Sequence, residues 1–359
     1  MSETLPIISV VIPIRNEERF IARTIRYLLE QDYPADRMEV LVVDGESDDR
    51  TVEIVTAIAK EDSRVRLLHN PRRLSSAARN VGSRAARGEI ITFVDGHTYI
   101  DNRHLLRNTA RLMAEKDVQV LSRPQFLETL ENTEFQTAVA LARRSTIGHG
   151  LDSTIYTSRD AYVNPTSSGA TYHRDVFNDV GYFDERFDAC EDVEFNYRVH
   201  LSGRSAFTSL KVAVYYYPRE SVGRLFTQMK RYGTGRFRLA RKHPATLAPG
   251  TLIPALFTAG LFGLLFLSLL LPHVGWILLG LYGLYAFMIF LSSATIAGRH
   301  GSHLLADLLV IYPTIHLGLG WGFLSELVRT MMGKGVDMSA AVVDESADAG
   351  KQAPSISER

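Results

Sequence analysis

The chain has 359 residues, with 40 basic and 40 acidic side chains and a formal net charge of +0. This balance argues against nucleic acid as a partner, because nucleic-acid-binding proteins usually carry a basic excess. The single cysteine, Cys190, excludes an internal disulfide and fits a reducing compartment.

Hydropathy divides the chain into two parts. Charged residues are dense up to about Lys242 and then nearly vanish until Arg299. The length indicates two or three structural units. The stretch up to Glu18 has no basic region ahead of its short apolar run, so it is not expected to be a signal peptide.

The N-terminal part alternates predicted strands and helices. Asn16 is expected to cap the first helix, with Glu17 and Glu18 in its first turn. Alternation of this kind predicts an α/β fold with a mostly parallel, three-layer sheet. The expected strands are residues 7–13, 39–43, 65–69 and 90–94, and the expected helices are residues 17–31, 51–60 and 75–86.

The strand at residues 90–94 ends in Asp95-Gly96-His97. Ligands of such sheets bind at the carboxyl ends of the strands. Side chains two residues apart in an extended chain point to the same side, so Asp95 and His97 are candidates to share one divalent cation. Asp44 ends another strand and would line the same crevice. The alternative for both aspartates is an ordinary turn or helix-cap carboxylate.

The middle of the chain has less regular patterning. Residues 128–162 are expected to form a long irregular region, and residues 164–170 a loop rich in small polar side chains. A helix is predicted to start at Glu191-Asp192 and to stop at Gly203. One of its two leading acids is a candidate general base facing the crevice, and the alternative is that both only compensate the helix dipole.

The C-terminal part predicts a membrane attachment. Residues 221–243 form a basic amphipathic segment, expected to lie in the membrane surface. Residues 251–271 and 274–297 are predicted membrane spans. Residues 308–325 are a marginal third span, interrupted by Pro313 and His316, and we favour three crossings over a re-entrant or interfacial segment.

The membrane segments also predict an orientation and a division of the chain. The basic residues before Thr251 predict that the N-terminal domain is cytoplasmic, although a third crossing would place Arg329 and Lys334 outside, against the positive-inside rule. The predicted units are a domain at 1–219, an interfacial segment at 220–245, a membrane region at 246–330 and a disordered tail at 331–359.

Seven stretches in order resemble a family 2 glycosyltransferase with the GT-A fold. The C-terminal segments are most similar to those of bacterial exopolysaccharide enzymes, in particular the succinoglycan-biosynthesis glucosyltransferases. The matching stretches are VVIPIRNEE (10–18), VVDGESDDRT (42–51), SSAARNVG (75–82), FVDGH (93–97), SSGATYHRDVFNDVGYFDE (167–185), EDVEFNYR (191–198) and QMKRYGTGR (228–236).

The resemblance implies roles for individual residues. It makes Asp192 the general base. It makes Asp95 and His97 the ligands of a divalent cation, Mn²⁺ or Mg²⁺. Because His97 replaces the last acid of the family's metal motif, and an imidazole suits Mn²⁺ better than Mg²⁺, the identity of the metal is open. Tyr232 stands where the family has Trp, and Gly45 where many relatives have a second Asp. Implied contacts of the donor nucleotide are Pro13, Asn16, Glu17, Asp44, Arg79 and Asp95, and those of the diphosphate or acceptor are Gln228, Arg231, Tyr232 and Glu191.

The implied activity is inverting transfer of a hexose, expected to be glucose, from a UDP-sugar to a sugar on polyprenyl diphosphate. Such an enzyme would work at the inner membrane during exopolysaccharide synthesis, alongside other polysaccharide-assembly proteins. Three alternatives remain: a polyprenyl-phosphate sugar synthase, a non-catalytic membrane partner of an assembly complex, and a nucleotidyltransferase. The last would require a glycine-rich phosphate loop after the first strand, where this chain has Ile14-Arg15-Asn16-Glu17.

Overall fold

The N-terminal half of the chain forms a sheet of parallel strands joined by helices. The computed structural model describes residues 5–127, 131–148, 159–167 and 169–338. In the order of the sheet, its first strands are β3 (Val65–His69), β2 (Met38–Asp44), β1 (Ile8–Ile14) and β4 (Ile90–Phe93), all parallel. The helices between them in sequence are α1 (Ile21–Leu29), α2 (Thr51–Glu61) and α3 (Ser75–Ala85).

Four further strands extend this sheet beyond β4 and make it mixed. Strand β9 runs antiparallel to both of its neighbours, and β8 runs antiparallel to β10. The added strands, in order, are β9 (Gly169–His173), β6 (Val120–Ser122), β10 (Ala206–Thr208) and β8 (Ala161–Val163). A small second sheet has the order β5 (Thr98–Tyr99), β11 (Val214–Tyr216) and β7 (Gln125–Phe126).

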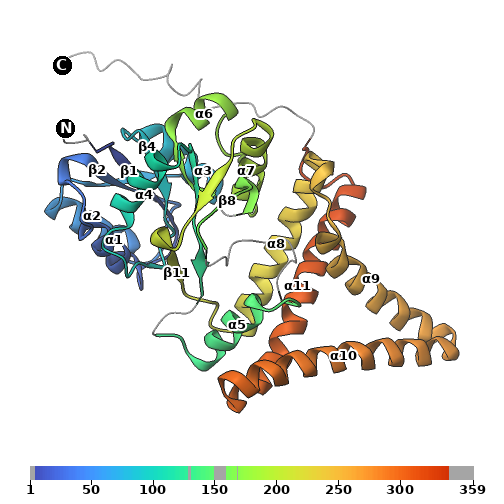
Figure 1. Ribbon diagram of the computed structural model, residues 1–359. Coiled ribbons are helices and arrows are strands. Elements are labelled where there is room, and N and C mark those ends of the chain that lie inside the picture. Colours follow the sequence, from blue (N-terminus) through green and yellow to red (C-terminus); the bar gives the residue numbers. More distant parts are fainter. Residues whose placement is uncertain (1–4, 128–130, 149–158, 168, 339–359) are drawn as a thin grey trace.

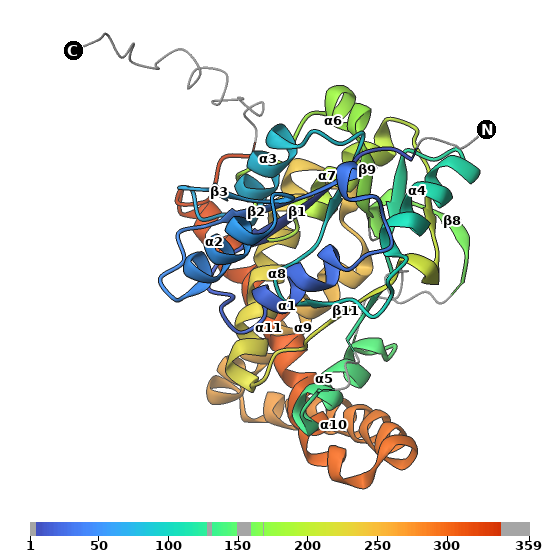
Figure 2. The same ribbon diagram turned by 90° about the vertical axis from the view of Figure 1, so that its left-hand side faces the viewer.

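Helices cover both faces of the large sheet, as Figures 1 and 2 show. Alternate residues of β1 point into two separate apolar cores, with Val10 on one side and Val11 on the other. The first core packs against α1, α2 and α4 (Leu105–Glu115). The second packs against α3, α6 (Arg174–Val180) and α7 (Glu191–Leu201). The predicted mostly parallel, three-layer α/β architecture is confirmed.

Two local predictions were wrong. Asn16 does not cap a helix: α1 begins at Ile21, and Asn16 has a left-handed backbone with φ of 59°. Within the region expected to be irregular, α5 spans Glu134–Arg144. The side chains of Thr133 and Gln136 form a reciprocal capping box at its start, a sequence signal that would have located this helix. Residues 128–130 and 149–158 of that region lie outside the described residues.

Four long helices complete the described chain. Helices α9 and α10 leave the pair formed by α8 and α11 and meet at a corner far from the sheet (Figure 1). Helices α9, α10 and α11 are long and apolar enough to cross a membrane. The bounds are α8 (Val222–Lys242), α9 (Pro249–Leu270), α10 (Pro272–His300) and α11 (Leu305–Met331). Short 3₁₀ turns lie at Ala35–Arg37, Pro165–Ser167, Leu210–Val212, Pro244–Thr246 and Ser302–Leu304.

Helix α8 packs along α11 through glycines. A Cβ added to Gly233 of α8 would lie 2.0 Å from the carbonyl oxygen of Leu319, and one added to Gly322 of α11 would lie 2.0 Å from that of Lys230. The two backbones are therefore in direct contact. Two residues of the apolar stripe of α8, Leu225 and Met229, are buried against α11, whereas Val222 of the same stripe is exposed. The placement of residues 220–245 at the membrane surface stays a prediction.

The chain just after α11 also contacts the α/β domain. Arg241 donates a hydrogen bond to the carbonyl oxygen of Val336 at 3.1 Å, and Met338 is buried beside Phe187 and Leu239. Residues 332–338 are thus ordered against the protein, contrary to the expected tail from residue 331. Residues 339–359 lie outside the described residues.

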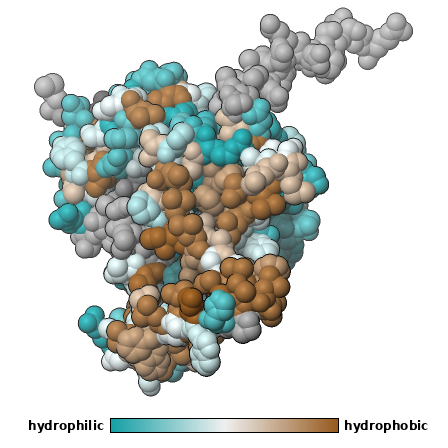
Figure 3. Space-filling view, turned by 90° about the vertical axis from the view of Figure 1, so that its right-hand side faces the viewer, coloured by the Kyte–Doolittle hydropathy of each residue, from teal (hydrophilic) through white to brown (hydrophobic). Residues whose placement is uncertain are grey.

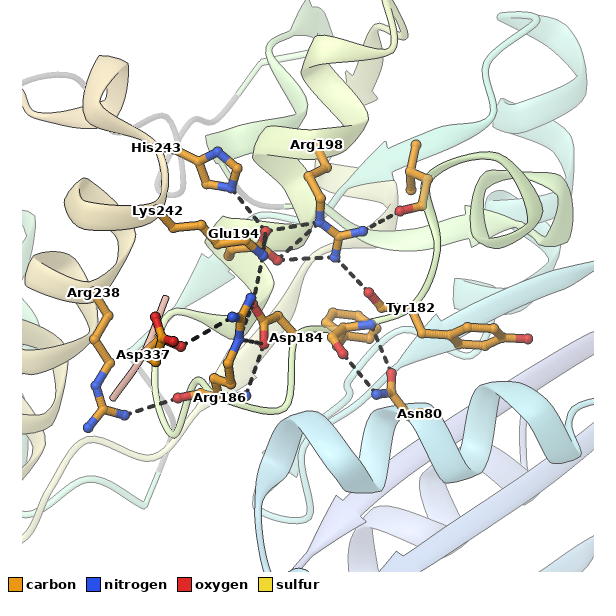
Figure 4. Close-up of polar contacts among 12 residues, drawn as sticks. Asn80, Tyr182, Asp184, Arg186, Glu194, Arg198, Arg238, Lys242, His243 and Asp337 are labelled. Carbon is orange, nitrogen blue, oxygen red and sulfur yellow. Dashed lines mark hydrogen bonds and ion pairs between the residues drawn. The ribbon is translucent and has the colours of Figure 1, made fainter. Parts of the chain in front are cut away.

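A buried network of charges fixes α7 against the end of α8 (Figure 4). Lys242 donates to Asp184 at 2.6 Å and to Glu194 at 2.7 Å. Glu194 lies on α7 with no exposed side-chain surface, and it also accepts hydrogen bonds from Arg198 and pairs with His243. Burial alone would raise the pKa of Asp184 and of Glu194. The neighbouring cations have the larger effect, so both pKa values are lowered, that of Glu194 to about 2. Both carboxylates are therefore ionised.

Replacing Lys242 by Met is expected to lower the free energy of unfolding by about 3 to 5 kcal/mol, because two buried carboxylates lose the cation that they share. Thermal unfolding of the detergent-solubilised chain, followed by circular dichroism, measures this loss. The neighbouring exposed Arg241, replaced by Met, is the matched control and should cost about 1 kcal/mol or less. Equal losses in the two variants would contradict this role of the network.

The same variant should unfold at a higher pH. A carboxyl group whose pKa is lowered on folding from 4.5 to about 2 stabilises the fold fully above pH 4.5, and this stabilisation is lost as the pH falls from about 4.5 to about 2. Removing Lys242 raises the pKa of Glu194 in the folded state, so this stabilisation is lost at a higher pH. Superimposable acid-unfolding curves for the variant and the unaltered chain would refute the coupling.

Candidate active site

A cavity of about 1180 Å³ lies at the carboxyl ends of the central strands, between the α/β domain and α8. It is called the central cavity below. Its wall is formed by the ends of β1 and β4 and by the starts of α3 and α7. Of the residues predicted from the sequence, those that line it are Pro13, Glu17, Arg79, Asp95, His97, Glu191, Asp192, Gln228, Arg231 and Tyr232.

Arg79 joins the two sides of the central cavity. Its Nη2 atom donates to Asp95 at 3.4 Å, and its Nε atom lies 3.4 Å from the carboxylate of Glu191. The guanidinium group also packs 5.0 Å from the ring of Phe93 and 5.7 Å from that of Phe183. Burial alone would lower the pKa of Arg79, but the surrounding carboxylates raise it, so the side chain is a permanent cation.

The two acids at the start of α7 have different environments. Glu191 is buried and paired with Arg79; burial and the neighbouring Asp192 raise its pKa. Asp192 is half-buried, and its Oδ1 atom accepts a hydrogen bond from the backbone of Val193 at 2.8 Å. Among the described residues Asp192 has no ion-pair partner. Its carboxylate therefore remains available to accept a proton inside the cavity.

His97 is held by a carboxylate. Its Nδ1 atom lies 2.8 Å from Oε1 of Glu17. Burial lowers the pKa of His97, but the hydrogen bond and charge of Glu17 raise it above its ordinary value. This contact leaves the Nε2 atom of His97 as the one available to a ligand, the arrangement usual for histidines that bind metals. Within the described part of the chain, no three His, Cys, Asp or Glu side chains are grouped to hold a metal by themselves.

Asp44, which is buried, and Asn16, which is exposed on the surface, do not line the cavity. Asp44 is buried, and its carboxylate accepts hydrogen bonds from the hydroxyl group of Ser47 at 2.5 Å and from the Ser47 backbone at 3.1 Å. The side chain of Asn16 accepts from the backbone of Asp48 at 3.0 Å. Both residues fix the loop after β2, of which only Gly45 lines the cavity.

Three residues of α8 face the start of α7. Arg231 donates to the carboxylate of Asp188 at 3.0 Å and to its carbonyl oxygen at 2.7 Å. The amide of Gln228 donates to the Tyr232 hydroxyl group at 3.4 Å. Burial raises the pKa of Tyr232, so its phenol is neutral. The predicted diphosphate and acceptor side chains thus border the same cavity as the predicted base.

Several cavity arginines were not predicted from the sequence. Arg143 of α5, Arg219 and Arg236 line the cavity; Arg236 ends the matching stretch at residues 228–236, but the sequence analysis assigned no role to any of the three. Arg123 follows β6, is 2 % exposed, and donates to the hydroxyl group of Thr92 at 3.0 Å and to the carbonyl oxygen of Phe93. Its position beneath β4 supports the strand that presents Asp95. A lone arginine after a short buried strand carried no recognisable signal.

Comparisons with known proteins identify the family. The family model described as "Glycosyl transferase family 2" matches residues 9–181. A succinoglycan biosynthesis protein, ExoA of Rhizobium meliloti, is 31% identical over 282 residues, which cover 77% of this chain and 82% of that protein. A dolichyl N-acetyl-α-D-glucosaminyl phosphate 3-β-D-2,3-diacetamido-2,3-dideoxy-β-D-glucuronosyltransferase of Methanococcus voltae is 25% identical over 239 residues, covering 66% and 74% of the two chains.

A solved structure shares the fold. The mannosyltransferase PcManGT of Pyrobaculum calidifontis, in complex with GDP-mannose and Mn²⁺, matches with a TM-score of 0.55 and 20% identity over 92% of this chain and 88% of that one. The chain belongs to glycosyl transferase family 2. It is a glycosyltransferase with a GT-A-like α/β fold and three long apolar C-terminal helices.

Proposed function

We propose that this glycosyltransferase moves a hexose from a UDP-sugar to a sugar carried on polyprenyl diphosphate, with inversion, during bacterial exopolysaccharide synthesis. The hexose is taken to be glucose, from the resemblance to succinoglycan-biosynthesis enzymes. The observation that supports this proposal most is the unpaired carboxylate of Asp192, which borders the same cavity as Arg79 and Asp95. A relative named for a dolichyl-phosphate-linked acceptor supports a lipid-linked sugar as the class of acceptor.

The donor would occupy the end of the cavity next to β1 and β4. Pro13 and Glu17 border it, and the uracil would bind near Gly45. Asp44 and Asn16 would then act by positioning the loop that contains Gly45. Arg79 supplies a buried cation to the negative charge that builds on the leaving diphosphate.

The residues at the end of β4 fit a divalent cation held jointly with the donor. Asp95 is partly exposed to the cavity, and the contact of His97 with Glu17 orients its Nε2 atom. A carboxylate with an imidazole suits Mn²⁺ better than Mg²⁺, and PcManGT was solved with Mn²⁺. When bound, such a cation neutralises charge on the donor's phosphates.

Removal of divalent cations is expected to abolish transfer, because Asp95 and His97 do not neutralise a diphosphate themselves. The measurement is UDP release by the purified chain after chelation and after adding back Mn²⁺ or Mg²⁺. We expect Mn²⁺ to restore more activity than Mg²⁺. Full activity in the chelated enzyme would remove the metal from the proposal.

Asp192 would act as the general base. It takes the proton of the acceptor hydroxyl group while the oxygen of that group forms a bond to the anomeric carbon. The bond from this carbon to the UDP oxygen breaks, and UDP leaves with the bonding electrons. A single direct displacement inverts the anomeric centre. Glu191 is unsuited to this role because it is paired with Arg79.

Replacing Asp192 by Asn is expected to lower transfer by about 10²- to 10⁴-fold while UDP binding is kept. Glu191→Gln, its neighbour, tests the assignment and should lose less turnover. If Asp192→Asn turns over normally with polyprenyl phosphate as acceptor, the chain is instead a polyprenyl-phosphate sugar synthase, whose phosphate acceptor needs little base catalysis. Absence of UDP release with every lipid acceptor would favour a non-catalytic membrane partner.

Membrane attachment is proposed to involve two crossings, α9 and α10, with the catalytic domain on the cytoplasmic side. In the most apolar 18-residue stretch of each helix, the share of residues buried within the protein is 11% in α9 and 6% in α10, whereas it is 44% in α11. Apolar side chains gather over the middle and lower part of the face shown in Figure 3. The basic residues at the end of α8 support the cytoplasmic orientation.

Both ends of α11 are attached to the catalytic side. Near its start, Tyr312 donates to Ser145 after α5 at 2.8 Å. Near its end, Glu326 pairs with Arg238 of α8 at 2.8 Å. A full crossing would carry this charged pair into lipid, so α11 is proposed to lie along the domain at the membrane surface. Arg329 and Lys334 then fall on the cytoplasmic side, in agreement with the positive-inside rule.

A green fluorescent protein fused to the C-terminus is expected to fluoresce, because two crossings return the chain to the cytoplasm. Alkaline phosphatase inserted between Leu271 and Pro272, at the corner of α9 and α10, should be active because it faces the periplasm. The reverse fusions at each position serve as controls. A C-terminal phosphatase that is active would show three crossings and contradict this topology.

A further inference from the structure

The central cavity does not end at the catalytic carboxylates. It continues along one face of α8, formed by residues three or four positions apart that all line it. In order from the catalytic end, these are Gln228, Tyr232, Arg236 and Leu239. Arg236 lies four residues beyond Tyr232, which is about 6 Å along a helix axis. The cavity therefore passes from a polar end to an apolar end along a single helix.

The far end of the cavity is walled by the apolar helices. Thr251 and Pro254 of α9 line it, together with Phe323 of α11, while Ile315 and Leu319 line the cavity nearer to Gln228. These helices approach closely at Gly320, where an added Cβ would lie 2.2 Å from the carbonyl oxygen of Pro254. The cavity thus runs without interruption from Asp192 to the part of the protein proposed to contact lipid.

Arg236 is the cation at the junction of the two ends. It is exposed to the cavity and, among the described residues, has no hydrogen-bond or ion-pair partner. Other arginines of the same helix are paired, Arg231 with Asp188 and Arg238 with Glu326. The neighbouring Gly235 packs against Ala189 and Cys190, which fixes this turn of α8 beside the start of α7. An unpaired guanidinium between a catalytic acid and an apolar groove is complementary to a lipid phosphate.

We propose that this end of the cavity binds the isoprenoid diphosphate of the acceptor. Arg236 binds the diphosphate, the isoprenoid chain lies against α9 and α11, and the sugar reaches back toward Asp192. This inference rests on the proposed lipid-linked acceptor and assigns its binding site. It makes Arg236 a residue that determines acceptor affinity, without a part in the chemical step or in donor binding.

The test uses farnesyl diphosphate as a short isoprenoid diphosphate, titrated into the full chain in detergent. Arg236→Gln is expected to weaken its binding more than about tenfold, because a charge-assisted hydrogen bond to a phosphate is lost. Arg236→Lys should retain most of the affinity. Arg224→Gln is the matched control, since Arg224 is an exposed arginine of α8 outside the cavity. UDP binding should be unchanged in all three variants.

A second pair of variants tests the apolar end. Thr251→Trp adds bulk to the cavity wall and is expected to abolish farnesyl diphosphate binding. Ile253→Trp adds the same bulk on the exposed face of α9 and should leave binding intact. Farnesol, which lacks the phosphates, should bind to the unaltered chain and to Arg236→Gln with the same, weaker affinity.

The outcomes separate this site from the proposed function. Unchanged farnesyl diphosphate binding in both Arg236→Gln and Thr251→Trp would overturn the site even if the enzyme transfers sugar to lipid acceptors. Loss of binding in these variants would uphold the site even if no UDP-sugar is turned over. Equal displacement of the probe by phosphatidylglycerol and by undecaprenyl diphosphate would also overturn it, by showing a general anionic-lipid surface.

Discussion

The site depends on the burial of one guanidinium group between two carboxylates. Arg79 bridges Asp95 at the end of β4 and Glu191 at the start of α7, elements that are far apart in sequence. Because Glu191 neutralises this cation, the adjacent Asp192 remains free. The two neighbouring acids thus differ only in their surroundings. Glu191 links α7 to Arg79, whereas the carboxylate of Asp192 borders the cavity and has no ion-pair partner among the described residues.

The position of α7 in turn depends on charges at its other face. Lys242 of α8 is shared by Asp184 and Glu194, and Glu194 lies on the same helix as Asp192. The cost of burying these carboxylates is offset only while α8 remains in place. Since α8 is packed backbone to backbone against α11, the orientation of α7 is tied to the long apolar helices.

The sequence was sufficient for the α/β architecture because buried parallel strands are continuous apolar runs, as in residues 90–94. The strand and helix boundaries in the sequence also led to Asp95 and Asp192, both of which line the central cavity. The sequence did not show that Asp44 is hydrogen-bonded to Ser47, since a strand-end acid that faces a cavity has the same local pattern as one bound in a turn. Arg123 was missed because its position is set by tertiary packing alone, and Arg236 because nothing in the stretch 228–236 distinguishes it from the other basic residues of the same helix.

Helix α8 has partners within the protein that its hydropathy did not indicate. Its residues form three stripes instead of the two that an amphipathic analysis assumes. Met229, Gly233 and Phe237 pack on α11; Arg231, Arg238 and Lys242 are paired with carboxylates; and Tyr232, Arg236 and Leu239 line the cavity. A helix with a basic stripe beside an apolar stripe is typical of a helix at a membrane surface. The sequence pattern does not reveal that carboxylates elsewhere in the chain pair with the basic stripe. In the folded chain Asp188, Glu326 and Asp184 pair with the basic stripe, and α8 forms the wall of the central cavity between the start of α7 and the apolar helices α9 and α11.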